Sequence, residues 1–328
     1  MLAITNKTFG GPEVLSISSV PDPIPNDEEI LVEVHATALN RADILQRLGK
    51  YPPPQGASTI LGLEMAGVVV ATGKNVKKWQ LGDAVFGLLP GGGYATLAVI
   101  HQDMAMRIPT GLSMLEATAI PEVFLTAYQA LFRLAKLQNQ EKVLVHAGAS
   151  GVGTALIQLA KTTKAMVLAT ASSPKHAICF ELGADDVFDY KKGAFKPWVM
   201  QHTQEKGVDV VVDFIGGHYF SENIACLQMD GRLVQLATMG GTKISDFNLG
   251  LLLRKRLTLI GSTLRNRGLA YQIELTREFA EYSLEKFQNK TLTPVLGKVF
   301  AMNEVQEAHR YMEANKNVGK IVLKIKNE

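Results

Sequence analysis

The hydrophobic pattern is clearest in the middle of the chain, where short apolar runs alternate with segments of helical spacing. Val143–Val145 reads as a buried strand, because it is a continuous apolar run of mostly β-branched residues. After a turn of small residues, Val152, Leu156, Leu159 and Ala160 fall on one face of a helix. Strand, small-residue turn and helix in this order are typical of the first βαβ unit of a nucleotide-binding domain.

The same alternation continues downstream. Further strands are expected at 165–170, 186–189, 208–213, 232–236 and 257–261, with a helix at 175–182 that ends at Gly183. Alternating strands and helices predict an α/β fold with a doubly wound parallel sheet. Ligands of such sheets bind beyond the carboxyl ends of the strands. We therefore expect Thr170, Asp213–Gly216 and Met239–Gly241 around one crevice.

The first 120 residues have a different pattern, in which short alternating strands at 30–36, 66–71 and 84–87 are separated by proline and glycine clusters. This pattern predicts a mainly β domain, barrel-like or sandwich-like, with one helix at 38–48. The tail is expected to form a helix at 269–288, a strand at 295–300, a helix at 304–315 and a strand at 320–325. Because it does not extend the βαβ alternation, we expect it to return to the first domain.

The turn after the first central strand carries the candidate cofactor site. The glycines are Gly148, Gly151 and Gly153, and the strict pattern is Ala149-x-Gly151-x-Gly153 rather than Gly-x-Gly-x-x-Gly. Glycines let the backbone approach a pyrophosphate, and the helix N-terminus favours its negative charge. The alternative is an ordinary tight turn.

Composition bounds the class of protein. An apolar content of 47% and a charged content of 20% are ordinary for globular proteins. A net charge of +3 is too small to indicate nucleic-acid or membrane binding. Two cysteines exclude a disulfide framework or a cysteine-rich zinc site, so we expect a cytoplasmic protein. The N-terminus lacks a signal-peptide pattern, and no apolar run has membrane-spanning length.

Two groups of polar residues bear on other chemistry. The seven histidines show no i, i+3 or i+4 pairing that would suggest a metal site. Arg254–Arg256 and Arg265-x-Arg267 form a basic cluster, which suits either RNA contact or, as we favour, a solvated helix end.

An ordered set of motifs covers essentially the whole chain. It consists of Asn40-Arg-Ala-Asp43, Leu61-Gly-Leu-Glu-Met-Ala-Gly67, Leu81-Gly-Asp-Ala-Val85, Gly92-Gly-Tyr-Ala95, Ala147–Gly153 and Asn317–Leu323. The set resembles the medium-chain dehydrogenase/reductase superfamily, in its zinc-independent quinone oxidoreductase branch. Tyr51, Leu88–Gly93 and His309–Asn317 resemble the stress-inducible subgroup and its bacterial relatives.

The resemblance implies a GroES-like β domain and a Rossmann domain, with boundaries at 1–121 plus 266–328 and at 122–265. It implies hydride transfer from NADPH to a quinone or an activated alkene in the cleft between the domains. Such chemistry needs no metal, because the quinone is electrophilic and the nicotinamide supplies the hydride.

Several candidate residues near the reaction follow. The resemblance places Asn40, Asp43 and Thr126 near the nicotinamide; for the first two the alternative is helix capping and a surface charge. Tyr51 lies on a loop stiffened by prolines, where its phenol can donate to an oxyanion or merely pack. Ser150 suits a cofactor phosphate, the substrate or only the turn itself. Glu64 occupies a family position near the former metal site, where a structural role is equally compatible.

The second central strand indicates the choice of cofactor. An NAD site places a carboxylate about 20 residues beyond the glycines, whereas this strand is followed by Ser172, Ser173 and Lys175. These side chains suit a 2′-phosphate, and the family position of Tyr190 suggests that it covers the adenine. The alternative is that Lys175 is only a solvated residue in the first helical turn. The remaining cofactor positions that the resemblance implies are Val152, Thr170, Ile215, Gly216, Met239, Gly240, Leu264 and Asn317.

Three further expectations complete the hypothesis. We expect no zinc, because Leu63 stands where zinc-dependent relatives carry a histidine ligand. We expect a homodimer through the apolar stretch 257–264, which would otherwise leave a sheet edge open. The alternative activities are reduction of an enone, alkenal or enoyl thioester, and the alternative class is an NADPH-stabilised binding protein that contacts RNA.

Overall fold

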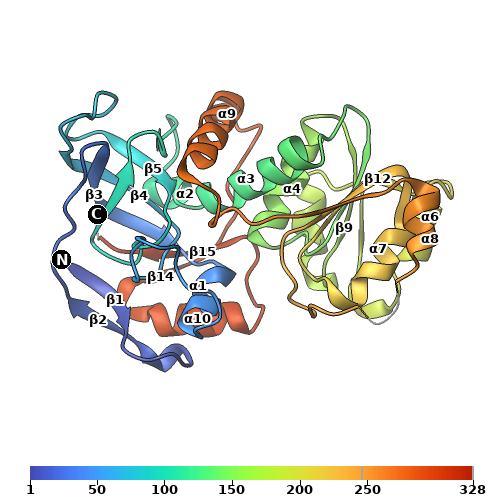
Figure 1. The fold of residues 1–328 in the computed structure, drawn as a ribbon, viewed down its shortest axis with the longest axis horizontal. Coiled ribbons are helices and arrows are strands. Elements are labelled where there is room, and N and C mark those ends of the chain that lie inside the picture. Colours follow the sequence, from blue (N-terminus) through green and yellow to red (C-terminus); the bar gives the residue numbers. More distant parts are fainter. Residues whose placement is uncertain (245–246, 327–328) are drawn as a thin grey trace. The chain divides into compact units, whose positions relative to one another are not determined.

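The computed structural model describes residues 1–244 and 247–326, and its contacts divide the chain into two compact units (Figure 1). The first unit contains Met1–Leu125 and Arg265–Glu328, and the second contains Thr126–Leu264. The predicted domain boundaries, 1–121 with 266–328 and 122–265, differ from this division by four residues at the first junction and by one at the second. The tail folds with the N-terminal part of the chain.

A large mixed sheet forms the first unit. Its order is β14-β15-β3-β4-β5-β7, and β6 also pairs with β3. The strands are β3 (Glu29–Ala38), β4 (Glu64–Thr72), β5 (Ala84–Leu88), β6 (Leu97–His101), β7 (Ala105–Arg107), β14 (Leu296–Ala301) and β15 (Lys320–Lys324), and β1 (Leu2–Asn6) pairs separately with β2 (Leu15–Ser19). The long strand β3 alternates between buried and half-buried residues over most of its length, as expected for a strand with one buried face. It pairs with β15, β4 and β6.

Helices and short turns complete the first unit. They are α1 (Arg41–Arg47), α2 (Met114–Ala117), α9 (Leu269–Gln288) and α10 (Val305–Glu313), with 3₁₀ turns η1 (Pro12–Val14) and η6 (Met302–Glu304). Helix α3 (Pro121–Tyr128) begins in this unit and ends in the second. The predicted helix 38–48 starts later, because Ala38 is still paired with Val322 of β15. The core beneath α10 contains Ile4, Leu39 and Ile321, which come from three distant parts of the sequence.

The second unit is a parallel sheet with the order β10-β9-β8-β11-β12-β13, which confirms the predicted doubly wound fold. The strands are β8 (Lys142–Val145), β9 (Met166–Thr170), β10 (Asp186–Phe188), β11 (Val208–Asp213), β12 (Leu227–Gln235) and β13 (Thr258–Gly261). The helical elements are η2 (Gln129–Leu134), α4 (Gly151–Lys161), η3 (Ser173–Lys175), α5 (His176–Glu181), η4 (Tyr190–Lys192), α6 (Lys196–His202), η5 (Gly217–Tyr219), α7 (Phe220–Cys226) and α8 (Leu249–Lys255). Because β8, β9 and β11 are buried on both faces, they read as continuous apolar runs.

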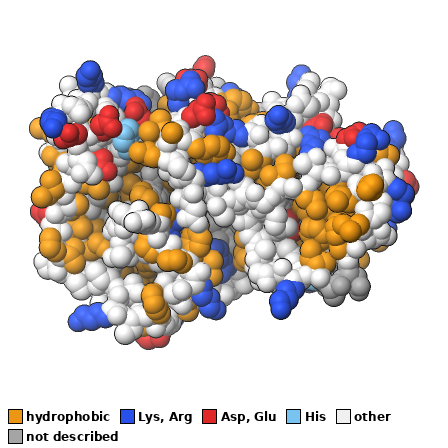
Figure 2. Space-filling model, in the orientation of Figure 1, with side chains coloured by type: hydrophobic (Ala, Val, Ile, Leu, Met, Phe, Trp, Pro, Cys, Tyr) orange, Lys and Arg blue, Asp and Glu red, His pale blue; other side chains and the backbone are white. Residues whose placement is uncertain are grey.

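Strand β13 is the last strand of this sheet and, within the described residues, pairs only with β12. Several large apolar side chains in β13 and in the segment before it are exposed, namely Ile244, Leu249, Leu253 and Leu259. Figure 2 shows apolar side chains gathered on the surface of the second unit. No helix in residues 1–244 and 247–326 is long and apolar enough to cross a membrane.

Candidate active site

Asn40 and Asp43 lie at the start of α1, where they cap the helix. Asn40 is the N-cap residue, and its backbone N–H donates to Asp43 Oδ2 at 2.7 Å. Both residues therefore stabilise the N-terminus of α1. The other part of the alternative interpretation, a surface charge, is wrong, because the Asp43 side chain is buried.

Asp43 makes further contacts inside the first unit. Its Oδ1 accepts from the backbone N–H of Gly62 at 3.0 Å, and the hydroxyl of Tyr94 donates to Oδ2 at 3.3 Å. Burial raises the pKa of Asp43 to about 6, although the backbone donors and Lys320 oppose this effect. A carboxyl with this pKa gains and loses its proton close to neutral pH.

Glu64 begins β4 and is fully buried. The Lys320 ammonium pairs with Oε1 at 2.7 Å, the Asn40 amide donates to the same oxygen at 2.8 Å, and the backbone N–H of Glu122 donates to Oε2 at 2.8 Å. Lys320 also donates to the carbonyl oxygen of Leu39 at 2.9 Å and to Asn40 Oδ1 at 2.7 Å. Glu64 and Lys320 are thus a buried ion pair whose polar atoms have further partners.

Lys320 was not among the predicted site residues. In the sequence it lies inside the motif Asn317–Leu323, where a lysine before an apolar strand is expected to be exposed. The structure places it at the first position of β15, beside the start of α1 and of β4.

Glu122, in the first turn of α3, lies close to this cluster. Burial is the largest cause that raises the pKa of its carboxyl to about 8, the negative charge of Glu64 adds to the shift, and Lys320 opposes it. The carboxyl of Glu122 is therefore mainly protonated at neutral pH. Sequence reasoning did not single out this residue, since a glutamate in the first turn of a helix has an ordinary explanation.

A chain of buried polar groups extends from Asp43 to α10. His309 Nδ1 lies 3.1 Å from Arg47 Nη1, and its Nε2 lies 3.3 Å from the hydroxyl of Tyr94. Arg47 also forms an ion pair with Glu313. Burial lowers the pKa of His309 to about 3, so the ring is neutral.

The neutral ring of His309 fixes the direction of this chain. Arginine can only donate, so Nδ1 must accept from Arg47 and Nε2 must carry the hydrogen. That hydrogen is donated to the oxygen of Tyr94, whose own hydroxyl hydrogen is then directed at Asp43. Every donor in this chain has an acceptor, and the chain ends on the Asp43 carboxylate.

Tyr51 is half-buried in the loop between α1 and β4. The guanidinium carbon of Arg265 lies 5.4 Å from the centre of its ring. Burial raises the pKa of the Tyr51 phenol, and the positive charge of Arg265 opposes that shift. The phenol therefore keeps its proton at neutral pH and can act as a donor.

Arg265 corrects one interpretation of the sequence. The sequence predicts that Arg265 and Arg254–Arg256 form one solvated cluster. Arg265 is instead only 6% exposed, and it belongs to the first unit. Arg254 and Lys255 do lie in the last turn of α8, as the helix-end interpretation requires. The basic cluster is therefore not one surface.

The turn between β8 and α4 has the expected strand–turn–helix geometry. Ser150 is the N-cap residue of α4, and its Oγ accepts from the backbone N–H of Gly153 at 3.0 Å. A Cβ on Gly153 would lie 2.2 Å from the carbonyl oxygen of Ala147, so this glycine is already required by the turn itself. The N-terminus of α4, preceded by Gly148 and Ala149, offers backbone donors to an anion.

A buried polar chain connects the ends of the central strands. The Thr170 hydroxyl lies 3.0 Å from His146 Nδ1, and Nε2 lies 2.6 Å from Asn223 Oδ1. The amide nitrogen of Asn223 donates to Asp213 at 3.0 Å. Burial lowers the pKa of His146, so this histidine is a neutral core group with both nitrogens bonded. Asp213 also accepts from the backbone N–H groups of residues 215 and 216, at 2.6 and 3.0 Å.

Two of the predicted cofactor segments lie against each other. The backbone N–H of Met239 donates to Phe214, and that of Gly240 donates to Ile215. A Cβ on Gly216 would lie 3.0 Å from the carbonyl oxygen of Gly241, and φ is +66° at Gly216. The structure thus brings 213–216 and 239–241 together, as the predicted crevice requires.

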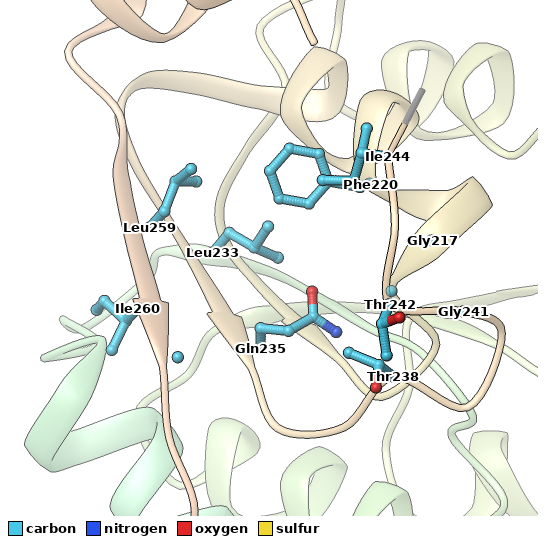
Figure 3. A pocket seen from close by; sticks show the side chains of 12 residues that line it. Gly217, Phe220, Leu233, Gln235, Thr238, Gly241, Thr242, Ile244, Leu259 and Ile260 are labelled. Atoms are coloured by element: carbon cyan, nitrogen blue, oxygen red, sulfur yellow. The ribbon is translucent and has the colours of Figure 1, made fainter. Parts of the chain in front are cut away.

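A cavity of about 220 Å³ opens beside these two loops (Figure 3). Apolar side chains from Phe220, Leu233 and Leu259 lie on one side of it, and Gln235, Thr238 and Thr242 lie on another. The mostly apolar lining suits an uncharged group rather than a phosphate.

The region after β9 holds the predicted ribose-end residues. Ser172 precedes η3, which contains Ser173 and Lys175. The Ser173 hydroxyl donates to Asp189, a buried carboxylate that follows β10. This hydrogen bond and the backbone N–H of Lys191 lower the pKa of Asp189. The local sequence contains no carboxylate, but the fold brings one to Ser173.

The other predicted positions are spread over the two units. Tyr190 is exposed at the start of η4, Thr126 lies in α3 and Val152 in α4. Leu264 is buried at the end of the second unit. The Asn317 amide donates to the carbonyl oxygen of Gly319 at 3.1 Å, in the first unit. Among the described residues, no three histidine, cysteine or acidic side chains are arranged to hold a metal ion.

Comparisons with known proteins agree with this architecture. Residues 26–110 match the family model of the alcohol dehydrogenase GroES-like domain, and residues 151–281 match that of the zinc-binding dehydrogenases. Quinone oxidoreductase from Lama guanicoe is 30% identical over 99% of this chain and 98% of its own length. A highly-reducing polyketide synthase of Aureobasidium melanogenum is 32% identical over 94% of this chain, which spans 14% of that protein.

Solved structures give the same result. Escherichia coli quinone oxidoreductase in complex with NADPH has a TM-score of 0.89 and 28% identity, over 99% of this chain and 100% of its own. The CurK enoyl reductase has a TM-score of 0.88 and 30% identity, over 99% of both chains. The fold and these matches define a medium-chain dehydrogenase/reductase, an oxidoreductase that uses a nicotinamide cofactor. Within that superfamily, the chain belongs to the zinc-independent quinone oxidoreductase branch.

The raised pKa of Glu122 generates a stability prediction. Its carboxyl has a pKa of about 8 in the folded chain against an ordinary 4.5, so the folded state binds the proton more tightly between these values. Stability of the wild type therefore falls as pH rises from about 4.5 to 8. Glu122→Gln removes this loss. We expect its melting temperature to exceed that of the wild type at pH 9, by at least about 2–4 °C, and to approach it at pH 5.

The exposed Glu285→Gln is the matched control, and its melting curve should follow that of the wild type at every pH. Equal pH dependence in the wild type and Glu122→Gln would mean that Glu122 is ionised in the folded protein.

Proposed function

We propose that this chain catalyses NADPH-dependent hydride transfer to a quinone without a metal. The observation that carries the proposal is the full-length similarity to quinone oxidoreductases, one of them solved with NADPH, together with a strand–turn–helix anion site. NADPH, when bound, supplies the hydride. The residues of the chain bind and orient the reactants and exclude water.

For the cofactor, we propose that the backbone donors at the N-terminus of α4 bind the pyrophosphate. Ser150 caps this helix as an acceptor, so its hydroxyl hydrogen can still be donated to a cofactor phosphate. Lys175 supplies a cation for the 2′-phosphate of the adenosine ribose. The hydroxyl of Ser173 already donates its hydrogen bond to Asp189, so Ser172 and Lys175 are the better candidates for phosphate contact.

For the acceptor, we propose a site in the first unit near Asn40, Asp43 and Tyr51. The buried network around Asn40 and Asp43 holds both side chains in one geometry, which favours a positioning role. The Tyr51 phenol keeps its proton and can donate to an oxygen on which negative charge develops. The proposal of the stress-inducible subgroup rests on the motifs at Tyr51, Leu88–Gly93 and His309–Asn317 alone.

Reduction of an enoyl thioester is the second candidate function. The CurK enoyl reductase is as similar in fold and sequence as the quinone oxidoreductases are. Both reactions deliver a hydride to a carbon conjugated with a carbonyl group, so the same residues serve either acceptor. A role as an RNA-contacting protein has less support, because Arg265 is buried and belongs to a different unit from Arg254–Arg256.

We also propose a homodimer in which β13 pairs with its own copy. The strand ends its sheet, and its Leu259 is exposed, as are Leu249 and Leu253 of the preceding helix α8. Antiparallel pairing about a two-fold axis would satisfy the open backbone groups of the edge and cover these side chains.

Measurements of NADPH oxidation with a panel of acceptors test the activity. We expect kcat/KM for at least one quinone to exceed that for alkenals and enoyl thioesters by tenfold or more. A preference for an enoyl thioester would replace the quinone assignment with the second candidate, and no turnover of any acceptor would reject both.

Cofactor choice is tested by Lys175→Ala. Removing the cation should raise KM for NADPH at least tenfold and change KM for NADH less than threefold, because only NADPH carries the 2′-phosphate. The exposed Lys206→Ala serves as the control and should leave both constants unchanged. An equal effect of Lys175→Ala on the two cofactors would contradict the assignment.

Sedimentation equilibrium of wild type and Leu259→Lys tests the dimer. We expect the wild type at micromolar concentration to have twice the chain mass, and the variant to dissociate, since two like charges would meet near the two-fold axis. Leu81→Lys, an exposed leucine of the first unit, should stay dimeric. A monomeric wild type would disprove the proposed interface.

A further inference from the structure

Arg265 is a buried cation with one unused donor. Its Nε donates to the carbonyl oxygen of Pro90 at 2.9 Å, and its Nη2 donates to the same oxygen at 2.7 Å and to Gln46 Oε1 at 2.7 Å. Its other terminal nitrogen, Nη1, is buried and has no hydrogen-bond partner within the described part of the chain. A buried N–H without an acceptor is costly, and an N–H on a charged group more so.

The positive charge of Arg265 also lacks a direct partner. Across residues 1–244 and 247–326, no carboxylate lies within ion-pair distance of its guanidinium. The acidic groups that influence it are Asp43, Tyr51 and Glu122. Asp43 already accepts from two backbone N–H groups and from Tyr94, while Tyr51 and Glu122 keep their protons at neutral pH. The charge is therefore incompletely neutralised.

The bonds that Arg265 does make hold its orientation. Pro90 O and Gln46 fix Nε and Nη2, and the ring of Tyr51 lies over the guanidinium carbon. Because Nε and Nη2 are held by hydrogen bonds and the guanidinium is planar, Nη1 points in a fixed direction. The charged guanidinium of Arg265 and the aromatic ring of Tyr51 thus lie close together in the first unit.

We propose that Arg265 is a catalytic residue of the proposed reduction, whose free Nη1–H donates to the carbonyl oxygen of the acceptor as that oxygen becomes anionic. This inference rests on the proposed function and assigns the ligand class as a planar ring that carries an oxyanion.

With a quinone as acceptor, the reaction is a two-electron reduction. A hydride from the reduced nicotinamide forms a C–H bond with a ring carbon conjugated to the carbonyl, and the displaced electron pair moves onto the carbonyl oxygen. The cofactor loses two electrons and the quinone gains them. Arg265 keeps its proton and stabilises the oxyanion, and water protonates this oxygen. Loss of a proton from the ring carbon that received the hydride, with protonation of the second carbonyl oxygen by water, then gives the aromatic hydroquinone.

Binding of a product-like anion to the whole protein tests this assignment without any turnover. The probes are 4-nitrophenol, at a pH at which it is the phenolate, and 4-nitroanisole, which has the same ring but a methylated oxygen. We expect wild type to bind the phenolate at least tenfold more tightly than the ether. Arg265→Met should bring the ratio of the two dissociation constants close to one and lower kcat by about 10²–10³.

Arg277→Met is the matched control, because it removes an exposed arginine of the same unit and should keep the wild-type ratio. Should Arg265→Met fail to fold, Arg265→Gln, whose amide can still donate to Pro90, decides by the same ratio. A wild-type ratio near one, or an unchanged ratio in the folded Arg265 variant, would overturn the inference.

The two proposals can fail separately. If the protein prefers the phenolate through Arg265 but reduces no quinone, the anion site is retained and the proposed activity is rejected. Quinone reduction without such a preference would keep the activity and remove Arg265 from it.

Discussion

The ion pair between Glu64 and Lys320 is the interaction on which the first unit depends. Both groups are buried, and each charge would be very unfavourable there without the other. Glu64 additionally accepts from Asn40 and from the backbone of Glu122, and Lys320 donates to Leu39. The pair therefore joins the starts of β4, β15, α1 and α3, and removing either partner would leave a buried charge uncompensated.

The other polar groups of the first unit are arranged around this pair. Arg47 forces His309 to accept at Nδ1, so the hydrogen bonds run in one direction through Tyr94 to Asp43. Such a chain resists rearrangement, because reversing one bond would leave a buried group unsatisfied. The same logic holds in the second unit, where His146 connects Thr170 to Asn223 and thereby to Asp213. Each unit thus fixes its candidate site residues with a neutral buried histidine.

The sequence predicted well those features that depend on neighbouring residues. Strand β8, the small-residue turn and α4 follow from local periodicity and from backbone geometry, so their order was readable. The capping role of Asn40 and Asp43 was also readable from their three-residue spacing. The sequence could not show that Asp43 is buried, because the groups that enclose it, among them Gly62 and Tyr94, are far away along the chain.

The sequence by itself determined the fold class, the course of the parallel sheet and the position of the nucleotide turn, because each rests on patterns within some ten to twenty residues. Only the tertiary structure decided the charges of the site. It made Lys320 the partner of Glu64, brought Asp189 to Ser173, and buried Arg265 in a different unit from the basic residues of α8. A charged residue looks alike in sequence whether it is solvated or buried, since its energy depends on groups that only folding brings near.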